Sequence, residues 1–82
     1  MQAPSGGLLG IEALLAEALE ALSRDQAEEA LIPALQAVEA APGQVRPLHI
    51  LGLALMRCGE LQESLASLEQ AAALDPASPD IH

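Results

Sequence analysis

An internal repeat with a period of 34 residues constrains the fold more than any other feature of the sequence. When the chain is shifted against itself by this distance, similar residues coincide without a slip in register. The matched pairs are Ile11 with Val45, Leu14 with Leu48, Ala18 with Gly52, Leu19 with Leu53, Ala27 with Leu61, Leu31 with Leu65, Ala37 with Ala71 and Pro42 with Pro76. A fixed period of this length is typical of solenoids, in which single units cannot bury their apolar faces alone.

Apolar residues recur at three- and four-residue steps within each unit, which predicts amphipathic helices. We expect one helix from Leu8 onward and further helices over residues 25–40, 46–58 and 60–74. Asp25 with Glu28 resembles a capping box that starts the second helix, and Pro33 predicts a bend within it. Pro47 falls in a first turn, where proline is tolerated. The apolar stripe expected on the fourth helix comprises Leu61, Leu65, Leu68, Ala71 and Ala72.

The predicted fold class is all-α, with antiparallel helical hairpins stacked as a short superhelical solenoid. Residues 1–10 are expected to form a flexible leader, and residues 11–78 the repeat domain. The first unit spans about 11–44 and the second about 45–78, while residues 79–82 begin a third unit or form a tail. Ala18 and Gly52 are small residues that would let the two helices of each hairpin approach closely.

A 34-residue helix-turn-helix unit that closes on proline resembles the tetratricopeptide repeat (TPR). The second unit carries the family's spacing most clearly, in Leu48, Leu51, Gly52, Leu55, Ser64, Leu68, Ala71 and Pro76. The sequence departs from the family where leucines 48, 55 and 68 occupy its aromatic positions. The first unit departs further, with Glu17, Ala18, Ala21 and Ala34 at signature positions.

The resemblance implies that the first helix of each unit lines a concave binding groove. The implied groove residues are Glu12, Leu15, Leu19, Leu22, Arg46, His49, Ile50, Leu53, Met56 and Arg57. The family's clamp for a peptide carboxylate is not supported, because Leu15, Leu19, His49 and Ile50 occupy its positions. A thin Leu/Ala bundle also needs most of its apolar residues inside, so the alternative role for many of these leucines is ordinary core.

Composition excludes several classes of partner. Twelve acidic residues against three arginines give a net charge of −9, which disfavours nucleic acid and anionic membrane surfaces. No apolar run is long enough to span a bilayer. A single cysteine and the lack of a secretory signal pattern lead us to expect a cytoplasmic protein.

The sequence offers no chemistry that requires a cofactor, a metal ion or a catalytic role. His49 and His82 lie 33 residues apart, and neither has a companion ligand at metal-binding spacing. Cys58 follows Arg57 and precedes a turn glycine, which is typical of a small packing residue more than of a reactive thiol. The carboxylates fall at helix starts or on expected solvent faces.

We therefore expect a protein-interaction or assembly module that binds a peptide, a helix or a second copy of itself through an apolar concave face. The outer face of the fourth helix is expected to be uncovered, which predicts a symmetric homodimer through the last hairpin or further repeats in a longer chain. The alternative function is a repeat segment that precedes a catalytic domain, since similar repeats precede sulfotransferase or glycosyltransferase domains in some proteins.

Overall fold

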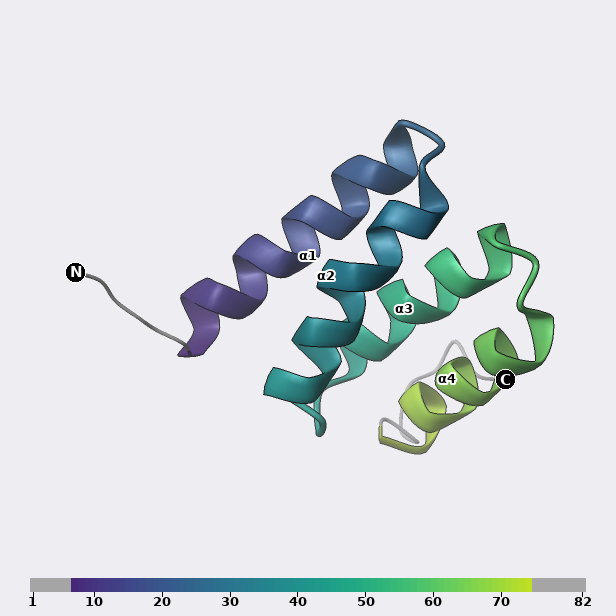
Figure 1. The fold of residues 1–82 in the computed structure, drawn as a ribbon. Coiled ribbons are helices and arrows are strands. Elements are labelled where there is room, and N and C mark those ends of the chain that lie inside the picture. Colours follow the sequence, from purple (N-terminus) through teal and green to yellow (C-terminus); the bar gives the residue numbers. More distant parts are fainter. Residues whose placement is uncertain (1–6, 75–82) are drawn as a thin grey trace.

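The computed structural model describes the backbone of residues 7–74 and the side chains of residues 10–74. Four helices account for most of this part of the chain: α1 (Gly7–Ser23), α2 (Ala27–Ala40), α3 (Val45–Arg57) and α4 (Leu61–Leu74) (Figure 1). No strand occurs between residues 7 and 74. The all-α class is confirmed, and each predicted helix is present with bounds shifted by at most two residues where bounds were predicted at both ends.

The leader expected over residues 1–10 is wrong for residues 7–10, because α1 already begins at Gly7. Once a helix has formed, each added residue gains a backbone hydrogen bond at little further cost, so α1 extends beyond its amphipathic part. The predicted start of a third unit at residues 79–82 lies outside the described residues.

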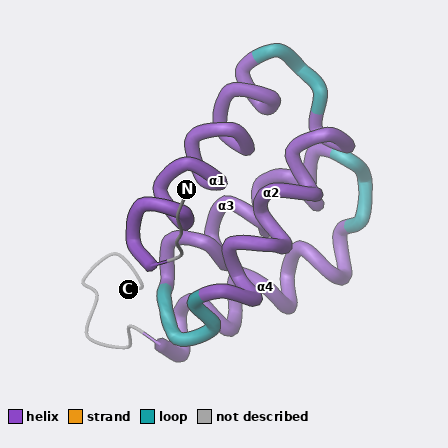
Figure 2. The backbone as a smooth tube through the Cα atoms, turned by 60° about the vertical axis from the view of Figure 1, so that its left-hand side comes forward, coloured by secondary structure: helices purple, strands orange, loops and turns teal. Residues whose placement is uncertain are grey.

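Helices that follow one another along the chain also pack against one another. Contacts join α1 to α2, α2 to α3, and α3 to α4, and α3 additionally touches α1 (Figure 2). The chain therefore forms two helical hairpins, and the first helix of the second hairpin covers both helices of the first. Short connections between helices favour this arrangement of antiparallel neighbours.

The 34-residue period of the sequence reappears in the backbone. Helix α4 begins and ends 34 residues after α2, at Leu61 against Ala27 and at Leu74 against Ala40. The turns within the two hairpins also correspond, since Asp25 and Gly59 both have positive φ, at 63° and 85°. In each turn the next residue's N–H donates to a carbonyl five residues earlier, from Gln26 to Ala21 at 2.8 Å and from Glu60 to Leu55 at 2.9 Å.

These two turns are Schellman motifs, which end a helix with one residue in the left-handed conformation. The capping box predicted at Asp25 is therefore wrong. Asp25 ends α1, and Gln26 is the N-cap of α2 without a side-chain capping bond. The turn needs a left-handed residue at this position, and aspartate tolerates that conformation better than most non-glycine residues.

Two prolines lie inside helices and are both buried. Helix α2 continues from Ala27 to Ala40 across Pro33, and the bend predicted there stays a prediction. Pro47 is the third residue of α3 and is almost fully buried. Its missing N–H costs nothing, because first-turn amides have no acceptor within the helix.

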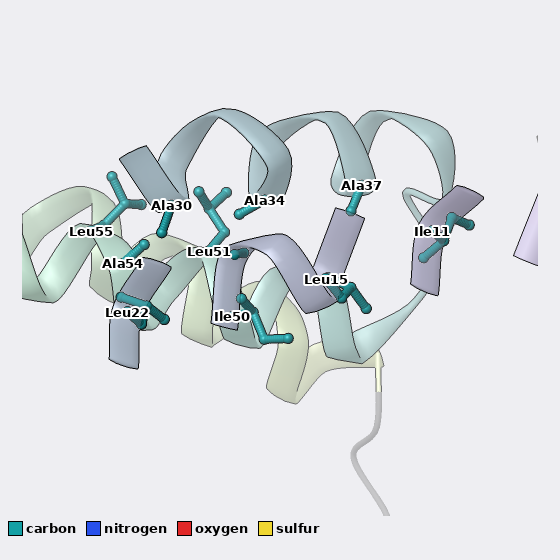
Figure 3. Packing of buried hydrophobic residues seen from close by; sticks show 11 residues of the cluster. Ile11, Leu15, Leu22, Ala30, Ala34, Ala37, Ile50, Leu51, Ala54 and Leu55 are labelled. Carbon is teal, nitrogen blue, oxygen red and sulfur yellow. The ribbon is translucent and has the colours of Figure 1, made fainter. Parts of the chain in front are cut away.

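The core lies where α1, α2 and α3 meet, and it is built largely from leucine, isoleucine and alanine (Figure 3). Its members are Ile11, Leu15, Ala18, Leu22, Ala30, Ala34, Ala37, Ile50, Leu51, Ala54 and Leu55. Alanines line the α2 side, so the larger side chains of α1 and α3 can interlock against a nearly smooth helix surface. Close approach therefore replaces the aromatic bulk that the sequence lacks.

Helix α4 packs on α3 through a face that is smaller and more polar than predicted. Its buried residues are Ser64, Ser67 and Ala71. The predicted apolar stripe is wrong for Leu61 and Leu65, whose exposed fractions are 64 % and 58 %. The reason is Gly52, where an added Cβ would lie 2.7 Å from the Leu68 side chain, so α4 approaches α3 with its small residues facing inward.

Candidate interaction face

The predicted groove residues separate into a buried group and an exposed group. Leu15, Leu22 and Ile50 are buried in the core, with Leu15 only 2 % exposed, so they are not available to a partner. They are buried because α3 packs directly on α1, and these side chains fill that contact (Figure 3). The groove assignment is wrong for these three, and their role is the core role kept open as the alternative.

The remaining candidates form one continuous surface on α1 and α3, which we call the α3 face. Arg46, His49, Met56 and Arg57 are exposed, Leu53 is half-buried, and Leu19 of α1 is 40 % exposed. On a helical projection the five α3 residues fall within one arc of roughly 100°. The sequence pattern therefore located this surface, although it also included residues that lie beneath it.

Two contacts tie the arginines of the α3 face to α1. The Arg46 guanidinium lies 3.5 Å from the carboxylate of Glu12, measured from Nη1 to Oε2. At the other end of the helix, Nη1 of Arg57 donates to the backbone carbonyl of Leu22 at 3.5 Å. Both contacts are long and leave the guanidinium groups accessible, because the Arg46 and Glu12 side chains are about three-fifths exposed. An exposed pair of this kind contributes little to stability.

Charge is distributed unevenly among the four helices. Helix α3 contains no acidic residue, whereas α1 has three glutamates, α2 three and α4 two. Two of the chain's three arginines and His49 lie on α3. The α3 face is therefore neutral to basic in a protein whose net charge is −9. Local charge of this kind attracts an oppositely charged partner even when the whole molecule is acidic.

Cys58 follows the α3 face at the C-cap of α3 and is half-buried. Desolvation raises the pKa of its thiol, and the carboxylates of Glu28 and Glu60 raise that pKa further. The thiolate is the reactive form of cysteine, so a raised pKa lowers reactivity at neutral pH. This agrees with a packing role for the side chain.

Two surface hollows accompany these features. One, of about 400 Å³, lies between the α1–α2 turn and the end of α3, and its lining includes Asp25, Glu28 and Arg57. The other, of about 330 Å³, lies where α2, α3 and α4 end and is lined by Val38, Pro42, Leu48, Gln70, Ala73 and Leu74. Within the part of the chain that the structure describes, no group of three potential ligands is placed to hold a metal ion.

Sequence reasoning missed one buried polar contact. Ser64 lies on α4, and its hydroxyl donates to the backbone carbonyl of Gly52 on α3 at 2.7 Å. The 34-residue alignment contained a signal for it, because Ser64 corresponds to the fully buried Ala30 of the first unit. A buried hydroxyl requires a hydrogen-bond partner, and the close approach at Gly52 provides one.

Comparisons with protein-family models, curated proteins and solved structures give no match to the chain. Among the helices within residues 7–74, none is long and apolar enough to cross a membrane.

Proposed function

We propose that this protein is a protein-interaction module built from two TPR-like units. The support is the recurrence of the same features at 34-residue intervals, namely the bounds of α2 and α4, the Schellman turns at Asp25 and Gly59, and the matched apolar residues. The contact of α3 with both α1 and α2 is the packing that successive units of a solenoid make. No catalytic step is part of this proposal.

The α3 face is the proposed binding surface. The observation that carries the proposal is that exposed apolar residues and the local basic residues coincide on this one helix. Met56 is 45 % exposed, and Leu53 lies one helical turn before it, with Arg46 and Arg57 at the two ends of the same face. Neighbouring exposed apolar side chains on one surface of a small protein are typical of a binding site.

The chemistry of the α3 face favours a partner segment that is both apolar and acidic. Apolar side chains of the partner would cover Leu53 and Met56, and also Leu19 across the contact with α1. Carboxylates would approach Arg46 and Arg57, whose present contacts are long and replaceable. An amphipathic helix or an extended peptide of this composition satisfies both requirements.

Selection from a displayed library of random peptides tests this function. We expect the selected peptides to be enriched in Asp, Glu and large apolar residues, and to lose binding to a Leu53→Glu/Met56→Glu variant. The matched control is Ile32→Glu/Leu35→Glu, which places the same charges at exposed apolar positions of α2, away from the α3 face. This control variant is expected to retain the peptides.

Circular dichroism must show that both double variants keep their helices. If the selected peptides bind the α3-face variant as tightly as the parent chain, the proposed surface is wrong. If the peptides are enriched in basic residues, the assigned partner chemistry is wrong.

A further inference from the structure

The 34-residue correspondence shows that the second hairpin exposes apolar positions that the first hairpin covers. Leu22 is 7 % exposed, whereas its counterpart Met56 is 45 % exposed. Leu31 is half-buried and packs against the core, whereas its counterpart Leu65 is 58 % exposed. The difference arises because α3 covers the end of the first hairpin, while none of the described helices covers the corresponding end of the second.

The uncovered residues of α4 form what we call the end stripe, composed of Leu61, Leu65, Leu68 and Ala72. Their spacings of four, three and four residues place them on one line along the helix. Leu61 and Leu65 are exposed, while Leu68 and Ala72 are half-buried at its inner edge. The same spacing forms the apolar seam of coiled coils, so the end stripe has the geometry that a second helix requires.

Other exposed apolar residues do not form such a line. Ile32 and Leu35 on α2 are 63 % and 48 % exposed, but Glu28 and Glu39 lie one turn away on the same side of that helix. Carboxylates at these positions keep water next to the apolar side chains. Exposure alone therefore does not distinguish the end stripe, whereas its continuity does.

We propose that the end stripe is a homodimer interface, in which α4 of one copy packs antiparallel on α4 of a second copy. A two-fold axis between Ala66 and Ser67 places Leu65 opposite Leu68 of the other copy. It also places Leu61, the most exposed leucine, opposite the small Ala72. Pairing a large residue with a small one lets the two stripes interlock, and a two-fold axis uses the same patch on both copies.

The charges beside the end stripe favour this antiparallel pairing. Glu69 and Gln62 lie on its solvent side. With the axis between Ala66 and Ser67, Glu69 falls near Gln62 of the other copy, so a carboxylate meets an amide. A parallel pairing would bring Glu69 opposite itself, which is destabilising. The net charge of −9 on each copy still causes long-range repulsion, which salt screens.

Sedimentation equilibrium of the 82-residue chain between about 10 µM and 1 mM tests the proposal. The stripe is small, and small interfaces belong to the weak class, so we expect a dissociation constant on the order of 100 µM. We expect tighter dimerisation in about 0.5 M NaCl than in 0.05 M, because screening removes repulsion between copies. Leu65→Glu should raise the dissociation constant by at least about 30-fold, since the two-fold axis introduces the change twice.

Ile32→Glu is the matched control, because Ile32 is as exposed as the stripe residues and lies on α2. It should change the dissociation constant by less than about twofold. A parent chain that stays monomeric at 1 mM with full helicity overturns the proposal, and the end stripe would then await a further helix or another protein. Equal effects of Leu65→Glu and Ile32→Glu also overturn it.

Cross-linking tests the direction of pairing. In a Cys58→Ala background, chains with Leu65→Cys are mixed with chains with Leu68→Cys and oxidised. Antiparallel pairing predicts that the mixed disulfide forms faster than either symmetric disulfide, because residue 65 lies opposite residue 68. Faster formation of the symmetric 65–65 disulfide would overturn the antiparallel arrangement.

Discussion

Replacing Gly52 with alanine tests the claim that close approach between α3 and α4 determines how the second hairpin packs. A Cβ at this position would lie 2.7 Å from Cδ2 and 2.8 Å from Cγ of Leu68. Both distances are shorter than carbon atoms tolerate without a shift. The Ser64 hydroxyl, which holds the Gly52 carbonyl at 2.7 Å, opposes any separation of the two helices.

The expected effect is the difference between two opposing contributions. Alanine in a helix interior is favoured over glycine by about 0.8–1.0 kcal/mol. Inserting a carbon into a well-packed contact costs about 1–3 kcal/mol, and strain in the Ser64 hydrogen bond adds up to about 1 kcal/mol. We therefore expect Gly52→Ala to lower the free energy of unfolding by about 1–2 kcal/mol. For a domain of this size, that corresponds to a fall in Tm of roughly 4–16 °C.

Gly10→Ala is the matched control, because Gly10 also lies in a helix but has no neighbour within 4 Å of an added Cβ. It should stabilise the protein slightly, by up to about 1 kcal/mol. Urea unfolding followed by circular dichroism measures both variants. In a Leu68→Ala background the clash is removed, so Gly52→Ala should there become neutral or stabilising. A Gly52→Ala variant that stabilises the parent chain as Gly10→Ala does would refute the close-approach reasoning.

Two further predictions concern the turn residues of the hairpins. Asp25→Gly should raise the free energy of unfolding by about 0.5 kcal/mol, because glycine adopts the φ of 63° without steric cost, and Asp25→Ala should lower it by about 1 kcal/mol; urea denaturation of both variants checks the sign. Cys58 should react with iodoacetamide more slowly at pH 7.5 than cysteine in an unstructured peptide, with its rate rising at higher pH, because its pKa is raised. Glu28→Gln should accelerate this reaction by lowering that pKa, whereas Glu63→Gln, which alters a carboxylate not among the causes of the shift, should leave the rate unchanged.

The sequence by itself determined the class of fold and the place of its elements. Apolar periodicity predicted four helices, and the 34-residue repeat predicted corresponding hairpins, because both depend on local spacing along the chain. It also located the helix that bears the candidate binding face, since Arg46, His49 and Arg57 stand out in an acidic chain.

Only the tertiary structure decided which apolar side chains are covered. Leu15 and Leu19 are both leucines on α1, yet one is buried beneath α3 and the other is 40 % exposed. Likewise, Asp25 resembles an N-cap in sequence but is the left-handed residue of a Schellman turn. Helical periodicity defines a face but not the angle at which a neighbour meets it. That angle follows from how closely the backbones approach, which here depends on Gly52 and Ser64 across the contact between α3 and α4.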